Sequence, residues 1–348
     1  MSEEAPTQKA DAKAREDGGA APEVSATSGE SDAGSPESAV ERYRRLARER
    51  KVGPTQFIDA APPFDDDTLW RGLTREGEVR VLAVRATASV QEAVRRLECS
   101  ADVGRLLGEL MVATLLVRST LNPEERMQVF INHKGPTGQI VIDAWDTGGI
   151  RAFVASPQAN RKEHGFLIGE GTLQVTRSRG AAERSHRSTL ALQGEGVVDN
   201  MMHYLLESEQ ILSLLRVEMG QRGGVQSAVG LLVQLMPEGT REDLKRMVHN
   251  LQALPGLTVG MTPEDPDGRA WAEGLMDGFH WDQCAREAVR FQCRCSEERI
   301  LSMLATLPRA DIAELARGTE LLEMTCDYCK TAYRLKPARV ALLLQDPS

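Results

Sequence analysis

Four cysteines near the C-terminus have the type and spacing of metal ligands. They form two close pairs, Cys293-Arg294-Cys295 and Cys326-Asp327-Tyr328-Cys329, with thirty residues between the pairs. If folding brings the pairs together, four sulfurs surround one point, and zinc accepts that tetrahedral set of thiolates. Four protein ligands leave no open coordination position, so we expect one structural Zn²⁺ per chain and no catalytic site.

The Cys-x-Cys pair indicates a redox switch. With one residue between them, Cys293 and Cys295 can form a disulfide only under strain, and strain is typical of labile, regulatory bridges. Metal-bound sulfurs remain reactive thiolates that peroxide or hypochlorite can attack. Oxidation would eject the metal, and a module that needs the metal to fold would then unfold.

The segment around these cysteines is poor in large apolar residues. Helices are expected at 297–306 and 311–317, and a hairpin around 326–333, within a terminal module at 293–348. A core this thin normally needs a metal or a disulfide to fold. Its large apolar side chains are chiefly Ile300, Leu301, Leu304, Leu307, Ile312, Leu315, Leu321 and Leu322.

Three other interpretations of the cluster stay open. The first is a purely structural zinc site without switching, and the second is a zinc ribbon that binds nucleic acid. Nucleic-acid binding is disfavoured because seven basic and seven acidic residues balance between Cys293 and Lys336, whereas phosphate contacts need a positive surplus. The third is a thioredoxin-type site at Cys326 and Cys329, but no βαβ unit is predicted before it.

Upstream, the pattern predicts an α+β core at 66–238. The stretch 104–121 is apolar nearly all round, so we expect a buried helix. A Gly-Pro-Thr-Gly turn between two apolar runs predicts a β-hairpin of 127–133 and 139–145. The other expected elements are strands at 78–87, 150–155, 171–177, 188–193, 212–219 and 228–236, and helices at 90–97, 197–206 and 241–251.

Residues 239–292 are expected to connect the core to the terminal module. After about residue 250, glycines and prolines interrupt the pattern repeatedly while several large apolar residues remain. This combination predicts a segment that docks loosely on the core.

Residues 1–65 are expected to lie outside the folded core. Residues 1–40 hold nine acidic and three basic groups and almost no large apolar side chain, and the chain's net charge is −9. Such a segment cannot bury enough surface to fold, so we expect an acidic disordered tail, followed by a short charged helix at 41–51. No signal peptide or membrane span is recognisable, so we expect a cytoplasmic protein without membrane contacts.

At the cysteines the sequence resembles the redox-regulated 33 kDa chaperonin family (heat shock protein 33). The resemblance rests on two stretches, Cys293-Arg294-Cys295-Ser296-Glu297-Glu298-Arg299 and Met324-Thr325-Cys326-Asp327-Tyr328-Cys329, followed by Tyr333. Weaker similarities precede them in the expected order: Leu107-Gly108-Glu109-Leu110, Ser208-Glu209-Gln210 and Val233-Gln234-Leu235-Met236-Pro237.

The resemblance implies an ATP-independent holdase chaperone that is inactive while reduced and zinc-bound. It implies that the four cysteines are both the zinc ligands and the redox sensors, and that oxidation pairs Cys293 with Cys295 and Cys326 with Cys329. Zinc would then be released, and a metastable, redox-sensitive linker at 239–292 would unfold. A homodimer that binds unfolding client proteins would follow. Apolar linker residues are our candidate client contacts: Trp271, Leu275, Phe279 and Trp281.

Two features depart from the family pattern. The long acidic tail is one, and an inert solubilising role is favoured for it over a docking role. Cys284, nine residues before the switch, is the other. For Cys284 we favour a small buried apolar residue over an extra redox partner, and we expect Cys99 in the core.

Overall fold

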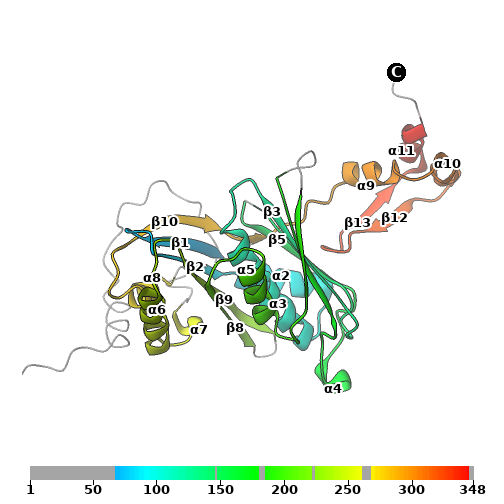
Figure 1. Cartoon of the computed structure of the whole chain (residues 1–348). Helices are drawn as coiled ribbons and strands as arrows, with labels where there is room; N and C mark the ends of the chain where they lie inside the picture. The colour runs from blue at the N-terminus through cyan, green and yellow to red at the C-terminus, as the bar shows by residue number, and fades with distance from the viewer. Residues whose placement is uncertain (1–66, 146, 180–184, 222–223, 261–267, 345–348) are drawn as a thin grey trace, which may run out of the picture. The chain divides into compact units, whose positions relative to one another are not determined.

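The structure is a computed structural model that describes residues 67–145, 147–179, 185–221, 224–260 and 268–344 (Figure 1). The predictions for residues 1–65, an acidic tail and a short charged helix, lie outside the described residues, as does the end of the terminal module at 345–348. Within the described ranges, no helix is both long and apolar enough to cross a membrane.

The first sheet, sheet A, has five antiparallel strands in the order β10-β1-β2-β9-β8. Strand β2 is present as the sequence predicts and pairs with both β1 and β9. Both of its faces are buried, with Val81 and Ala83 in one apolar cluster and Leu82 and Val84 in the other. The strands are β1 (Thr68–Thr74), β2 (Val79–Arg85), β8 (Ser213–Gln221), β9 (Val225–Leu235) and β10 (Trp281–Ala288).

The second sheet, sheet B, has six strands in the order β11-β5-β4-β3-β6-β7. The predicted hairpin is confirmed as the pair β3–β4, and β11 joins β5 in the one parallel pairing among the described strands. The strands are β3 (Arg126–His133), β4 (Ile140–Ala144), β5 (Gly149–Val154), β6 (Gly171–Ser178), β7 (His186–Ala191) and β11 (Arg290–Phe291), with the short helix α4 (Arg161–His164) between β5 and β6.

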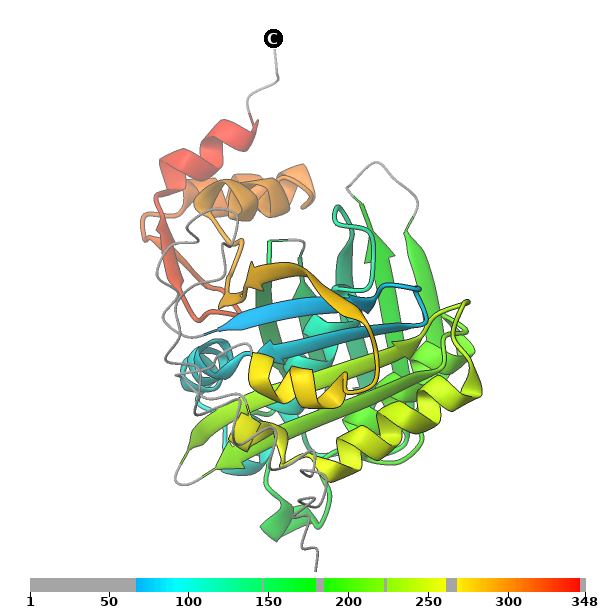
Figure 2. The ribbon, with the colours of Figure 1, turned by 90° about the vertical axis from the view of Figure 1, so that its left-hand side faces the viewer.

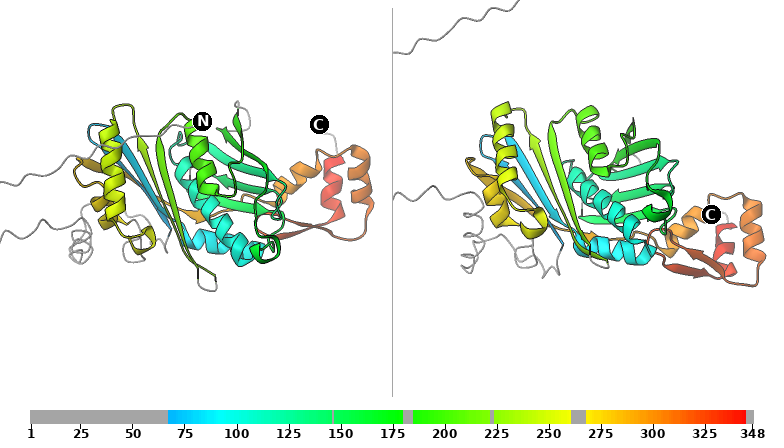
Figure 3. Two further views of the ribbon diagram at one scale, coloured as in Figure 1. Left: turned by 60° about the horizontal axis from the view of Figure 1, so that its bottom comes forward. Right: turned by 90° about the horizontal axis from the view of Figure 1, so that it is seen from below.

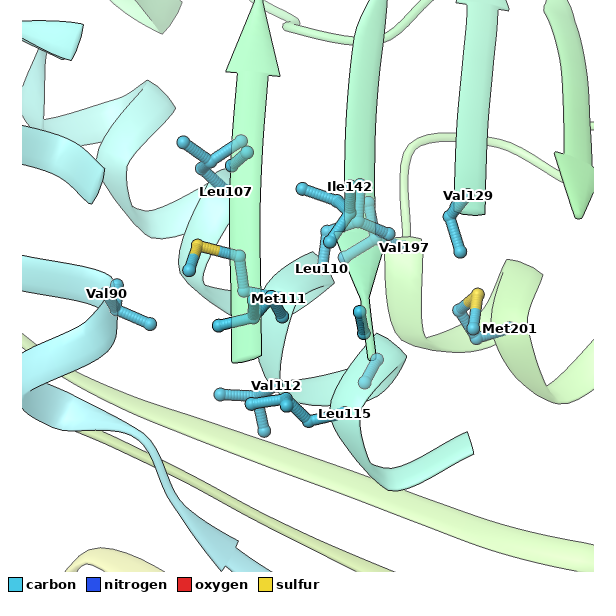
Figure 4. Close-up of a cluster of buried hydrophobic side chains, with 14 of the residues drawn as sticks. Val90, Leu107, Leu110, Met111, Val112, Leu115, Val129, Ile142, Val197 and Met201 are labelled. Carbon is cyan, nitrogen blue, oxygen red and sulfur yellow. The ribbon is translucent and has the colours of Figure 1, made fainter. Parts of the chain in front are cut away.

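The main core lies between the two sheets, around the helix α3 (Ala101–Arg118). The helices α2 (Thr87–Leu97) and α5 (Val197–Glu207) flank α3 in the same layer (Figure 3). Figure 4 shows α3 side chains meeting Val129, Ile142 and Met201 from β3, β4 and α5. The prediction of a buried α3 is confirmed, since most of its side chains are buried. A helix that is covered on all sides needs apolar residues all round, which is the pattern of its sequence.

A second apolar cluster covers the outer face of sheet A. It is formed by α6 (Arg241–Ala253), α7 (Leu257–Gly260) and α8 (Arg269–Leu275), which lie across the strands in Figure 2. A capping box between Thr240 and Asp243 starts α6. The Asn250 side-chain amide then donates to the backbone carbonyls of Leu275 and Asp277, which fixes the end of α8 against α6.

Residues 281–291, here called the strap, add one strand to the edge of each sheet. Strand β10 lies beside β1 (Figure 2), and β11 follows directly and pairs with β5. The pairing register shifts between Arg71 and Gly72, which places the backbone of Cys284 at a bulge opposite them. Both sheets therefore include residues beyond the predicted core boundary at 238; the metastability of 239–292 stays a prediction.

The terminal module has a small core of its own. Its buried apolar side chains are Leu304, Ile312, Leu335 and Val340, whereas Leu307 and Leu321 are exposed. Four buried side chains make a core as thin as the sequence predicts. The elements are α9 (Glu297–Leu304), α10 (Arg309–Arg317), β12 (Leu322–Thr325), β13 (Ala332–Leu335), α11 (Pro337–Ala341) and a 3₁₀ turn at Leu342–Leu344.

Candidate metal centre

The four predicted cysteines lie together on two short segments. Cys293 and Cys295 occupy the extended stretch between β11 and α9, where Ser296 caps the helix by accepting the amide hydrogen of Arg299. Cys326 and Cys329 occupy the turn that joins β12 to β13. The helix start and the hairpin turn thus hold the two pairs facing each other.

The spacing of the sulfurs fits a tetrahedral metal ion. All four Sγ atoms lie within 4.8 Å of one another. Cys293 Sγ is 3.7 Å from Cys326 Sγ, and Cys295 Sγ is 3.3 Å from Cys329 Sγ. Sulfurs bound at about 2.3 Å to one zinc ion would be about 3.8 Å apart. The donor set and its spacing therefore fit zinc, and the cysteines are free thiols placed to hold such an ion.

The hairpin turn is closed by its own backbone. The Cys326 amide donates to the carbonyl of Thr331, and the Lys330 amide donates back to the carbonyl of Cys326. Lys330 has a φ of 57°, in the left-handed region that non-glycine residues seldom adopt. This tight turn directs Cys326 and Cys329 to the same side.

Four sulfurs this close cannot all carry negative charge without a cation. Burial and the neighbouring sulfurs raise the pKa of Cys295 to about 12, despite a hydrogen bond from the Tyr333 hydroxyl at 3.0 Å, and burial raises the pKa of Cys326. Burial also opposes ionisation of Cys329, but hydrogen bonds with Thr331 and with the sulfurs of Cys295 and Cys293 together lower the pKa of Cys329 to about 7. A dication would supply the missing positive charge.

Arg151 of β5 connects the cluster to sheet B. Its guanidinium lies 3.7 Å from the centre of the Tyr328 ring, and its Nη1 is 3.6 Å from Cys293 Sγ. The same guanidinium forms an ion pair at 2.8 Å with Asp143, whose side chain is fully buried and also pairs with Arg126. The sequence analysis missed this residue, since nothing near Arg151 in sequence marks a contact with a turn about 180 residues later.

Other contacts between the core and the terminal module surround the same turn. The Arg294 guanidinium lies 4.6 Å from the Trp145 ring centre, and Arg96 of α2 donates a hydrogen bond at 3.0 Å to the carbonyl of Cys329. The backbone at the metal site is therefore held by contacts from α2 and β5 as well as by its own fold.

The strap leads directly into Cys293, the first candidate ligand in the chain. The Arg290 amide donates to the carbonyl of Gly148 and the Gln292 amide donates to the carbonyl of Ile150, so backbone pairing with β5 ends one residue before Cys293. A displacement of Cys293 is therefore expected to disturb the pairing of the strap with β5.

A pocket of about 350 Å³ opens beside the cluster. Cys295 and Cys326 contribute to its lining, with Arg294, Arg299 and the apolar side chain of Met303. Two of the four cysteines therefore border this opening.

Comparison with known proteins agrees with the site and the fold. The family model described as "Hsp33 protein" matches residues 67–336, a span that contains all four cysteines. The chain belongs to the Hsp33 family. Among its relatives, the 33 kDa chaperonin of Thermus thermophilus is 32% identical over 298 residues, which cover 80% of this chain and 86% of that protein. The 33 kDa chaperonin of Symbiobacterium thermophilum is 31% identical over 288 residues, 79% of this chain and 96% of that protein.

A solved structure shows the same fold. The crystal structure of the 33 kDa chaperonin from Thermotoga maritima superimposes with a TM-score of 0.68 at 23% identity, and it covers 80% of this chain and 98% of that chain. The predicted α+β fold with a terminal cysteine module is therefore confirmed. Membership of the Hsp33 family and the four-cysteine cluster fit a chaperone.

The four candidate client contacts belong to the apolar cluster on the outer face of sheet A: Trp271 and Leu275 lie in α8, Phe279 follows it, and Trp281 begins β10. Trp271 is 1% exposed and Leu275 is fully buried, while Phe279 and Trp281 are half-buried. In the form described here, a client of this Hsp33 family member could reach Trp271 and Leu275 only if the segment opened.

Proposed function

We propose that this protein is a redox-regulated, ATP-independent holdase that protects unfolding proteins from aggregation in the cytoplasm under oxidative stress. The observation that carries the proposal is that the cysteine cluster is connected directly to a segment that pairs with both sheets. Four sulfurs within 4.8 Å of one another are joined, through a single residue, to the strap on both sheets. The protein would bind clients and would not turn over a substrate.

In the reduced state, the four cysteines would hold one zinc ion. When bound, the ion stabilises the thiolate form of the cysteines and crosslinks the segment after β11 to the β12–β13 turn. Tyr333 and Thr331 then orient the ligands through their hydroxyl groups near Cys295 and Cys329. This crosslink would support a module whose described residues include a core cluster of four buried apolar side chains, with partly buried ones packed around it.

Oxidation would convert the ligands to disulfides. One thiolate sulfur attacks an oxygen of hydrogen peroxide, the O–O bond breaks, hydroxide leaves and a sulfenic acid forms. A second thiolate attacks that sulfur, and the S–S bond forms as a second hydroxide leaves. Two thiols and one peroxide thus give one disulfide and two waters, and each sulfur loses one electron.

The pairing of the disulfides decides whether the module opens. Bridges within each pair, Cys293–Cys295 and Cys326–Cys329, leave the two segments free to separate. Bridges between the pairs, Cys293–Cys326 and Cys295–Cys329, would join the segments covalently and hold the module closed. We propose the pairing within each pair that the resemblance to the Hsp33 family implies, followed by opening of residues 239–292, dimerisation and client binding.

One titration tests this function. Reduced, zinc-loaded protein is treated with increasing peroxide at mildly raised temperature, and zinc release is measured together with light scattering of a thermally unfolding client enzyme. We expect about one zinc per chain, no suppression of scattering before oxidation, and suppression that rises with zinc release.

Peptide mass mapping of the same samples identifies the disulfide bonds, and we expect the bonds Cys293–Cys295 and Cys326–Cys329. Zinc release without any client binding would contradict the chaperone proposal and leave a structural zinc ribbon. Bridges between the pairs in active protein would contradict the opening mechanism.

A further inference from the structure

The strap covers one edge of sheet A, the edge formed by β1. β1 has three side chains that are each 2% exposed, Thr68, Leu69 and Trp70, and Leu69 and Trp70 pack into the apolar clusters on the two faces of the sheet. Permanent edges are normally polar because an uncovered apolar strand pairs with other chains. Without the strap, β1 would be an uncovered edge strand with a buried leucine and a buried tryptophan on its two faces.

The strap covers β1 mainly through backbone pairing. Seven residues of β1 have partners in β10, and beyond the two ends of this ladder the amide of Arg75 donates to the carbonyl of His280 and the amide of Val289 donates to the carbonyl of Asp67. Because amides alternate sides along a strand, Leu73 and Asp282 also point their amides toward each other.

Side chains add a second set of contacts. Arg71 and Arg75 form ion pairs with Glu287 and Asp282 at 3.1 and 3.0 Å. Trp281 packs on Trp70 with ring centres 6.1 Å apart. If the strap left, β1 would present a row of unpaired amides and carbonyls, two arginines and an indole.

We propose that this edge of β1 is the docking surface for an extended segment of an unfolding protein, and that the strap occupies it until the cysteines are oxidised. The inference rests on the proposed holdase function and names the surface that performs it. The strap itself shows what fits: a strand that adds to the sheet through its main chain. Main-chain pairing is nearly independent of sequence, which suits a chaperone whose clients have no common motif.

The outer face of sheet A is the competing surface. It carries Val81, Val229 and Leu231 under α6–α8, and it would bind apolar side chains if those helices also left. A proline substitution in β1 distinguishes binding at the edge from binding at the face, because proline removes one edge amide and leaves the face unchanged. An edge strand tolerates proline where its amide points outward.

The test compares three oxidised proteins: the original chain, Leu73→Pro, and the control Gln283→Pro. Leu73→Pro removes an edge amide that would pair with a client, whereas the alternation places the Gln283 amide away from β1. Binding of a permanently unfolded, carboxymethylated lactalbumin is measured by fluorescence anisotropy. We expect Leu73→Pro to bind at least about fivefold more weakly and Gln283→Pro to bind as the original chain does.

Equal binding by all three proteins would overturn the edge proposal and leave the face of sheet A as the client surface. No binding by the oxidised original chain would instead contradict the holdase function itself.

A second measurement covers the case that Leu73→Pro does not fold. Hydrogen exchange of the oxidised original chain is followed with and without lactalbumin, and we expect the amides of 68–74 to regain protection with the client. Unchanged exchange there during client binding would overturn the edge proposal.

Discussion

At the scale of single residues, Arg151 is the group that couples the metal site to the core. It contacts the Tyr328 ring, the Cys293 sulfur and the buried Asp143 carboxylate at the same time. A planar guanidinium can stack on a ring and bind a carboxylate together, and an ammonium cannot do both. The type of residue at 151 is therefore expected to set how firmly the turn that carries Tyr328 is held.

Arg151→Lys keeps the charge beside Asp143 and removes the stacking on Tyr328. A cation–π contact is worth about 0.5–2 kcal/mol, so zinc transfer to a chelator during peroxide treatment should be roughly 2- to 30-fold faster. Arg126→Lys is the matched control, because Arg126 pairs with the same carboxylate from β3. If Arg151→Lys releases zinc at the original rate, or no faster than Arg126→Lys, Arg151 does not hold the turn.

The four cysteines show what can be predicted at this scale. Their assignment as one cluster needed only residue type and spacing, because the chemistry of a thiolate site restricts the ligands strongly. Arg151 and Arg96 could not be predicted, because their contacts with the cysteine turn depend on tertiary packing between segments distant in sequence.

At the scale of elements, the sequence predicted those with a strong internal pattern. The all-round apolar character of α3 and the turn between β3 and β4 are local signals, and both elements are present. Strand β10, Trp-Asp-Gln-Cys-Ala-Arg-Glu-Ala, was missed because it shows no alternation of apolar and polar residues. Strand β10 forms because its backbone pairs with the edge of β1. That pairing partner lies far away in the chain, so the sequence of β10 alone does not indicate it.

Gly148 shows how the strap depends on its neighbour. Gly148 has a φ of 69°, and a Cβ placed there would be 1.8 Å from the carbonyl oxygen of Ala288. Only glycine permits this backbone approach between β5 and the strap.

Gly148→Ala is therefore expected to displace the strap without touching a cysteine. The left-handed backbone costs alanine about 1–2 kcal/mol, and the clash adds to that cost. We expect faster proteolysis at 281–291 and partial client binding by reduced, zinc-loaded protein. Gly165→Ala is the control, since φ is 75° there and no atom lies within 4 Å of the added methyl. Equal effects of the two variants would show that backbone strain alone is responsible.

At the scale of the whole molecule, the chain joins a stable two-sheet core to a module with little core of its own. The layer between the sheets is built on α3, whereas the terminal module has four buried apolar side chains. The strap is hydrogen-bonded through its backbone to the two-sheet core, and the terminal module follows it in the chain. Oxidation of the four cysteines should therefore open the module and the strap before it opens the core, since regions with few buried contacts open first.

The α+β class and the separate cysteine module could be predicted at this scale, because each part has its own composition. The integration of residues beyond 238 into both sheets could not, since two short edge strands carry almost no signal in the sequence. Residues 1–66 lie outside the described structure, and their role stays with the sequence-based expectation of an acidic tail.

Hydrogen exchange of the strap tests the central claim most directly. Reduced, zinc-loaded protein is compared with peroxide-oxidised protein by mass spectrometry, peptide by peptide. The account predicts that peptides over 281–291 lose protection on oxidation, while those over β3, β4 and β6 keep it. If the strap kept its protection in oxidised protein that binds clients, the cysteines would not act through the strap, and the account would be wrong.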